Sequence, residues 1–126
     1  TAGAVLVAAR RPLVAFNVEL APPATLEDAQ AIAARIREGG PEGLESVRAI
    51  GLWLAARDVA QVSTNVEDHR TTPLANVVES IGRHATPSQA ELVGLAPRAA
   101  FDGFPDDLPV ANRRTVEDAL DHALEE

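Results

Sequence analysis

Three polar side chains recur at every second position of one strand-like segment. In VAQVSTNV (residues 59–66), Gln61, Ser63 and Asn65 alternate with valine and threonine. Carboxamides and hydroxyls both donate and accept hydrogen bonds, so this row suits a ligand with mixed donors and acceptors. Ser63 has neither the context of a nucleophile elbow nor a base nearby in the sequence. The pattern therefore predicts a binding surface rather than a nucleophile.

Other polar residues fall in segments that could join this surface. Asn17 lies in the strand-like LVAFNVEL (residues 13–20), and Glu91 opens ELVGLA. Glu91 could hold an amino group of a ligand, or it could be a charge at a strand edge. Arg10 and Arg11 precede the first strand, where an arginine could bind a carboxylate bidentately. The alternative for Arg10 is a surface ion pair with one of the nineteen acidic residues.

The three histidines are not expected to form a metal site. His69, His84 and His122 share no metal-ligand spacing, and the chain has no cysteine. We expect His69 to be a loop residue rather than a catalytic one. His84 is expected to close a helix, where a cation is favourable.

Composition limits the classes of protein. The 126 residues fit a single domain, and a net charge of -8 argues against nucleic-acid binding. No apolar run approaches the ~20 residues of a membrane helix. The chain lacks methionine and begins at Thr1, which we interpret as a piece of a longer protein. Aromatic residues are only 3%, so the core must consist of Val, Leu, Ile and Ala.

The hydrophobic periodicity predicts four strands and two helices, followed by a tail. Helices are expected after Thr25, which fits an N-cap, and after Thr72, with Pro73 at the first helical position. A helical tail is expected over about 101–126. The order βαββαβ predicts an α+β, ferredoxin-like domain with a four-stranded antiparallel sheet and both helices on one face. The strands are expected at residues 13–20, 48–54, 59–66 and 91–96.

The alternation within the strands assigns side chains to the two faces of this sheet. We expect the helices to cover Phe16, Val18, Ile50, Leu52, Val62 and Val66. The other face would be polar and uncovered, and its short carboxamides favour a lined groove over a plain solvated surface. We place on it Asn17, Glu19, Ala49, Gly51, Trp53, Gln61, Ser63, Asn65 and Glu91.

Four segments, in this order and spacing, resemble a known family. ARRPLVAFNVEL (9–20), AIGLWL (49–54), AQVSTNVEDHRTTPL (60–74) and ELVGLAP (91–97) are similar to the C-terminal subdomain of glutamate formiminotransferase. The resemblance covers roughly residues 1–100, and RHATPSQA is shorter than the corresponding family segment.

The resemblance implies an enzyme that transfers the formimino group from N-formiminoglutamate to tetrahydrofolate, its co-substrate, in histidine degradation. It also implies that folate binds between two subdomains. The catalytic acid/base histidine would lie in an N-terminal subdomain absent from these residues, so the isolated chain is expected to be inactive. The implied partners are that subdomain, a cyclodeaminase and a second copy, and the implied location is the cytoplasm. The folate- and substrate-binding candidates are Gly3, Arg10, Asn17, Gln61, Ser63, Asn65 and Glu91.

Two other functions stay open from the residues. The domain could be a stand-alone ferredoxin-like module that binds a small molecule or dimerises without catalysis. Alternatively, it could support a formyltetrahydrofolate cycloligase-like activity on the same folate scaffold.

Overall fold

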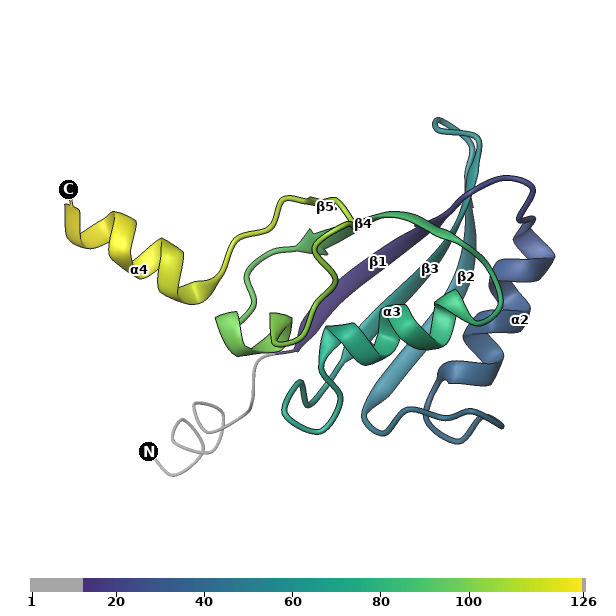
Figure 1. The fold of residues 1–126 in the computed structure, drawn as a ribbon, viewed down its shortest axis with the longest axis horizontal. Helices are drawn as coiled ribbons and strands as arrows, with labels where there is room; N and C mark the ends of the chain where they lie inside the picture. The colour runs from purple at the N-terminus through teal and green to yellow at the C-terminus, as the bar shows by residue number, and fades with distance from the viewer. Residues whose placement is uncertain (1–12, 126) are drawn as a thin grey trace, which may run out of the picture.

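The computed structural model describes residues 13–125, with side chains up to residue 121 (Figure 1). Its elements are β1 (Val14–Leu20), α2 (Leu26–Ile36), β2 (Val47–Leu54), β3 (Val59–Val66), α3 (Leu74–Gly82), β4 (Pro87–Val93), the 3-10 helix η1 (Arg98–Phe101), β5 (Val110–Ala111) and α4 (Val116–Glu125). The first six elements follow the predicted order βαββαβ. The α+β class is therefore confirmed.

The sheet differs from the prediction in having five strands rather than four. Its strand order is β2-β3-β1-β4-β5, and the first four strands pair antiparallel. β5 pairs parallel to β4 through only two residues, which makes the sheet mixed. The expectation of four antiparallel strands was wrong because two residues carry no detectable periodicity. The fourth strand also begins at Pro87, earlier than the expected residue 91.

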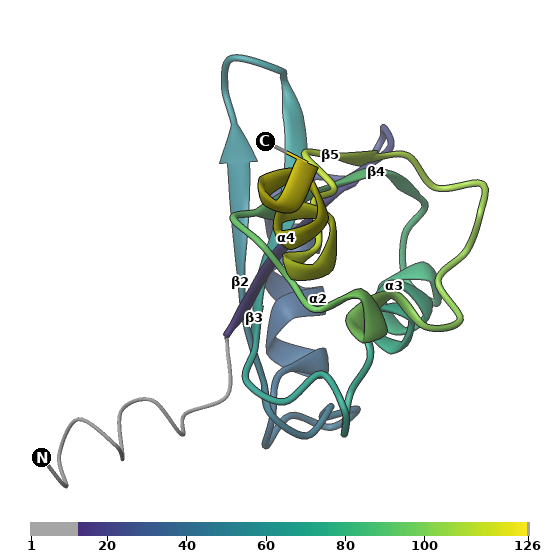
Figure 2. The same ribbon diagram turned by 90° about the vertical axis from the view of Figure 1, so that its left-hand side faces the viewer.

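Helices α2 and α3 lie on the same side of the sheet (Figures 1 and 2). α2 begins with a capping box, in which the Thr25 hydroxyl accepts from the Asp28 amide and the Asp28 carboxylate accepts from the Thr25 amide. α3 begins one residue later than expected, so Pro73 is its N-cap residue rather than its first helical residue. Such a difference of one residue is within the usual uncertainty of a helix end.

The core lies between the two helices and the sheet. It is dominated by Val, Leu, Ile and Ala, as predicted, with Phe16 and Phe101 in addition. The segment after β4 extends this helical layer, because Phe104 packs edge-to-face against both phenylalanines. The Arg113 guanidinium stacks on the outside of Phe101, 4.2 Å from the ring centroid. The segment expected to be a helical tail thus closes one end of the core and supplies β5 before α4 begins.

The side chains of β2 that face the helices are the ones that were predicted to lie on the uncovered face. Ala49 is 7% exposed and points toward α2, whereas Ile50 and Leu52 are 58% and 38% exposed on the other side. A Cβ added at Gly51 would lie 2.3 Å from the backbone nitrogen of Gln30, so Gly51 also faces α2. The assignment of Ile50 and Leu52 to the covered face was wrong. Small residues are required there because the backbone of α2 lies directly on the strand.

Candidate functional site

The sheet surface opposite the helices, here called the open face, carries a polar strip across its centre. The register places Ser63 opposite Ile50 on one side and Asn17 on the other, and Asn17 opposite Glu91. Because directly paired residues point to the same face of a sheet, these four side chains form one row across β2, β3, β1 and β4. The Asn17 amide lies 3.4 Å from the Glu91 carboxylate and donates to it.

A second row lies one step along the strands and is held by a charged network. Gln61 pairs with Glu19, and Glu19 pairs with Gln89. The Glu19 carboxylate accepts from Arg57 Nε at 3.1 Å and from Gln89 Nε2 at 3.0 Å. Glu19 is nearly buried, and these two donors satisfy its charge. This row is a fixed border of the polar strip, and it offers little free hydrogen-bonding capacity to a ligand.

A shallow hollow of about 290 Å³ lies over the first row. Asn65 is exposed beside it, and Ser63 and Asn17 are half-buried. Gln61 is 6% exposed and donates to the Ser63 hydroxyl at 2.9 Å, so it orients Ser63 rather than facing solvent. The hollow therefore combines two carboxamides, one oriented hydroxyl and an aliphatic wall. The open-face side chains among its lining residues are Asn17, Arg48, Ile50, Ser63 and Asn65.

The structure brings five of the predicted site residues together and leaves two undescribed. Asn17, Gln61, Ser63, Asn65 and Glu91 all lie on the open face of three adjacent strands. Gly3 and Arg10 lie outside the described residues. The binding roles of all seven stay predictions.

Three residues predicted for the open face lie on the other side of the sheet. Ala49, Gly51 and Trp53 pair with Thr64, Val62 and Ala60, which face the helices. Trp53 is still 42% exposed, but it cannot stack on a ligand held on the open face. Sequence reasoning missed Ile50 and Leu52 because a hydrophobic side chain is normally assigned to the core. The small residues Ala49 and Gly51 were the signal that the helix approaches the other side.

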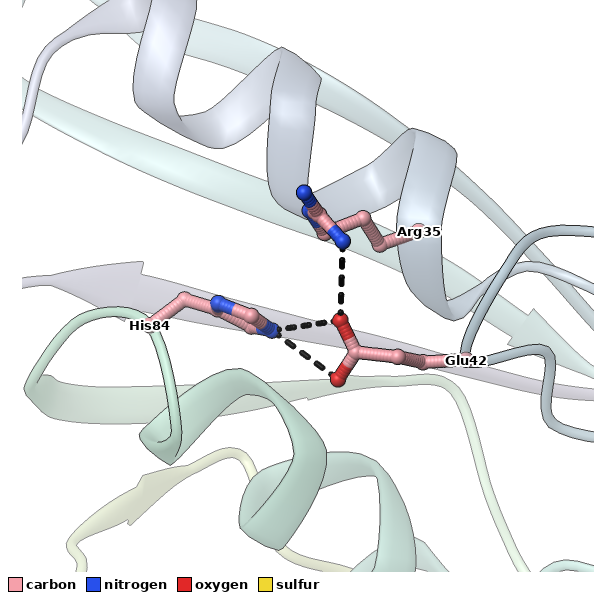
Figure 3. Close-up of polar contacts among 3 residues, drawn as sticks. All are labelled: Arg35, Glu42 and His84. Atoms are coloured by element: carbon pink, nitrogen blue, oxygen red, sulfur yellow. Dashed lines mark hydrogen bonds and ion pairs between the residues drawn. The ribbon is translucent and has the colours of Figure 1, made fainter.

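A separate cluster of charges lies in the helical layer, away from the open face. Figure 3 shows His84, which follows α3, beside Glu42 in the loop after α2 and Arg35 on α2. His84 Nε2 lies 2.9 Å from one Glu42 oxygen, and Arg35 lies 3.4 Å from the same oxygen. The hydrogen bond from His84 lowers the pKa of the Glu42 carboxyl. These contacts join the ends of the two helices, so the cluster acts as a structural clamp.

Two further carboxyl groups with lowered pKa values lie at the start of α4. The pKa of Asp118 is lowered by its hydrogen bond from Thr115, and that of Glu117 by the backbone amide of Arg98. His69 lies in the turn before α3, as predicted, and is buried. Within the described part of the chain, no three His, Asp or Glu residues are close enough to hold a metal ion. The described helices include none that is long and apolar enough to cross a membrane.

Comparisons with known proteins show a family model and several relatives to which the chain is similar. A sequence model described as the formiminotransferase domain matches residues 15–102. Formimidoyltransferase-cyclodeaminase of Gallus gallus is 40% identical over 109 residues, which are 79% of this chain and 20% of that protein. Glutamate formimidoyltransferase of Streptococcus pyogenes serotype M1 is 39% identical over 106 residues, 80% of this chain and 35% of that protein. The counterpart from Thermoplasma acidophilum is 33% identical over 105 residues, 79% of this chain and 34% of that protein. The chain thus spans about a fifth to a third of the length of these relatives.

Proposed function

The chain belongs to the formiminotransferase family, and we propose that it is the folate-side subdomain of a glutamate formimidoyltransferase. In this proposal the complete enzyme transfers the formimino group from N-formiminoglutamate to tetrahydrofolate, its co-substrate, in histidine degradation. The observation that carries the proposal is the hollow over Asn17, Ser63 and Asn65 on a sheet face that no element of residues 13–121 covers. The family match gives this otherwise general binding surface a substrate class.

The chemistry of the reaction fits the side chains of the hollow. Formimino transfer passes through a tetrahedral adduct at the amidine carbon, so it needs an acid/base and hydrogen-bond partners for the amidine nitrogens. Carboxamides such as Asn17 and Asn65 offer both donors and acceptors to an amidine or to the edge of a pterin. A hydroxyl held by Gln61 can do the same at Ser63. In our proposal this chain binds and orients the substrates.

We propose that a second subdomain supplies the acid/base histidine and covers the open face. Ile50 and Leu52 are exposed on that face, and their apolar side chains favour docking of another protein surface over full exposure to water. The names of several relatives include a cyclodeaminase, which we propose as a fused or associated partner. A homodimer and a cytoplasmic location stay predictions.

Folate binding by this chain is the direct test. The stable analogue 5-formyltetrahydrofolate would be titrated into the 126-residue chain and into Asn65→Ala, with binding followed by calorimetry or amide NMR shifts. Loss of one neutral hydrogen bond is expected to raise Kd by roughly 2- to 10-fold. The matched control is Asn76→Ala, because Asn76 is an exposed asparagine on α3 in the helical layer. That control should bind like the wild type.

The outcomes separate the proposal from its alternatives. Binding that Asn65→Ala weakens and Asn76→Ala does not would support a folate site on the open face. A folded chain that binds no folate at millimolar concentration would contradict the proposal and favour a docking or dimerisation module. Turnover of N-formiminoglutamate by the isolated chain would contradict the assignment of the acid/base to another subdomain.

A further inference from the structure

Strand β4 and the residues after it pair with the C-terminal segment at two separate places. β5 pairs with β4 at Ala90 and Glu91, and the two segments meet once more at a bridge between Ala96 and Thr115. Between these points, residues 92–95 run opposite the shorter segment 112–114. Gly94 and Asn112 both have positive φ angles, 79° and 59°, so each segment bends at this place. The two chains consequently separate.

The separation leaves a hollow of about 520 Å³. Glu91 and Val93 point to the open face by register, so the hollow opens onto that face. Val93 and Leu95 are 52% and 41% exposed and supply apolar wall. The polar lining comes from Glu91 on one side and from Asn112 and Arg114 on the other. The hollow therefore has an anionic side and a cationic side, separated by aliphatic surface.

Arg114 is one of three arginines, with Arg37 and Arg70, whose side chains have no partner among the described residues, and of these three it is the one that lines the hollow. Five others, Arg35, Arg48, Arg57, Arg83 and Arg98, form ion pairs with carboxylates. Arg113, the neighbour of Arg114, stacks on Phe101. Within residues 13–121, the Arg114 side chain has no ion pair or hydrogen bond, although the protein carries 19 acidic residues against 11 basic ones. No side chain of residues 13–121 therefore competes with an external anion for its guanidinium.

This hollow lies next to the hollow over Ser63 and Asn65. Asn17 lines one and Glu91 lines the other, and these two side chains are hydrogen-bonded to each other. A single elongated ligand could therefore lie across β3, β1 and β4. Its donor groups would meet the carboxamides and Glu91, and an anionic end would reach Arg114.

We propose that Arg114, with Asn112, forms a subsite for the carboxylate end of the ligand bound on the open face. This inference rests on the proposed function, which gives the ligand a glutamate moiety. That moiety could belong to the folate or to N-formiminoglutamate, and a guanidinium recognises the carboxylate of either in the same way. Arg114 would bind and position the ligand, and it would take no part in the transfer of the formimino group. The family match ends at residue 102, so Arg114 lies beyond the matched region.

The test compares ligands with and without the carboxylates. The 126-residue chain would be titrated with 5-formyltetrahydrofolate, with 5-formyltetrahydropteroamide, which lacks the glutamate and carries no carboxylate, and with N-formiminoglutamate, each followed by amide NMR shifts. Arg114→Leu removes the guanidinium, Arg114→Lys keeps the charge, and Arg37→Leu is the matched control at an exposed arginine of the helical layer. Unchanged thermal unfolding of Arg114→Leu would show that the variant is folded.

The expected result is a rise of about tenfold in Kd of Arg114→Leu for a glutamate-bearing ligand, because a hydrogen bond to a charged group is lost. Binding of the pteroamide should not change. The Kd of Arg114→Lys should fall between those of the wild type and Arg114→Leu, and the Kd of Arg37→Leu should match the wild type. Whichever glutamate-bearing ligand loses affinity is the source of the carboxylate. Equal weakening of pteroamide binding, or no weakening of either glutamate-bearing ligand, would overturn the subsite while leaving folate binding intact. Failure of all three ligands to bind the wild type would overturn the proposed function and the subsite together.

Discussion

Replacing Gly51 by alanine tests the contact that determines which face of β2 is covered. The added Cβ would lie 2.3 Å from Gln30 N and 2.5 Å from the carbonyl carbon of Ala29, against about 3.4 Å for ordinary contact. Both atoms belong to the backbone of α2, so no side-chain rotation can relieve the clash. The helix must therefore move away from the sheet by roughly 1 Å, a gap that forfeits a quarter to a half of the dispersion energy across it.

The size of the effect follows from what α2 buries. Its inward face contributes Ala29, Ile32, Ala33 and Ile36 to the core. Overpacking of a core usually costs about 1–3 kcal/mol, and we expect Gly51→Ala at the upper end because the obstacle is backbone. A loss of about 3 kcal/mol corresponds to a fall of roughly 11 °C in Tm for a chain of this length. Urea unfolding followed by circular dichroism would measure the free energy of unfolding.

The same substitution at Gly82 is the matched control. No heavy atom lies within 4 Å of a Cβ added there, and Gly82 is the last residue of α3. Alanine is favoured over glycine in a helix, so Gly82→Ala should stabilise the chain by up to about 1 kcal/mol. If Gly51→Ala unfolded within about 0.5 kcal/mol of the wild type, the packing of α2 on β2 described here would be wrong.

Two further predictions concern the open face and the clamp in Figure 3. Ile50→Ala should change the free energy of unfolding by no more than about 0.5 kcal/mol. Ile36→Ala, the same change at a fully buried site, should lower it by about 2–5 kcal/mol in urea unfolding. Equal losses in the two variants would mean that Ile50 is buried. Because the pKa of Glu42 is lowered in the folded state, its contribution to stability is present above its ordinary value of 4.5 and is lost as the pH falls through the lowered value. Urea midpoints measured from pH 6 to pH 3 should therefore fall less steeply below pH 4.5 in Glu42→Gln than in the wild type, and identical slopes would refute the role of the His84 contact.

Much of the architecture followed from local patterns in the sequence. Thr25 with Asp28 specifies the start of α2. The alternation in residues 61–66 places Gln61, Ser63 and Asn65 on one face of β3 and Val62, Thr64 and Val66 on the other, as in the structure. That strand was predictable because its two faces differ in polarity at each position. The row of Gln61, Ser63 and Asn65 on the open face could be predicted for the same reason.

Other features depended on contacts between segments that are distant in the sequence. In β2, the larger residues Ile50 and Leu52 lie outward, because the α2 backbone leaves room only for Ala49 and Gly51 beneath it. A hydrophobicity pattern records which residues are apolar, but it does not record how closely a helix will approach.

The hollow beside Arg114 also could not be predicted from local sequence patterns. Its walls come from β4 and from a segment about twenty residues later, joined by two short stretches of pairing. No local pattern marks Asn112 or Arg114 as neighbours of Glu91. The sequence by itself determined the order of the first six elements and the polar strip, since both depend on short-range periodicity. Only the tertiary structure decided which face of β2 is open and where the second hollow lies, because both follow from long-range packing of backbone against backbone.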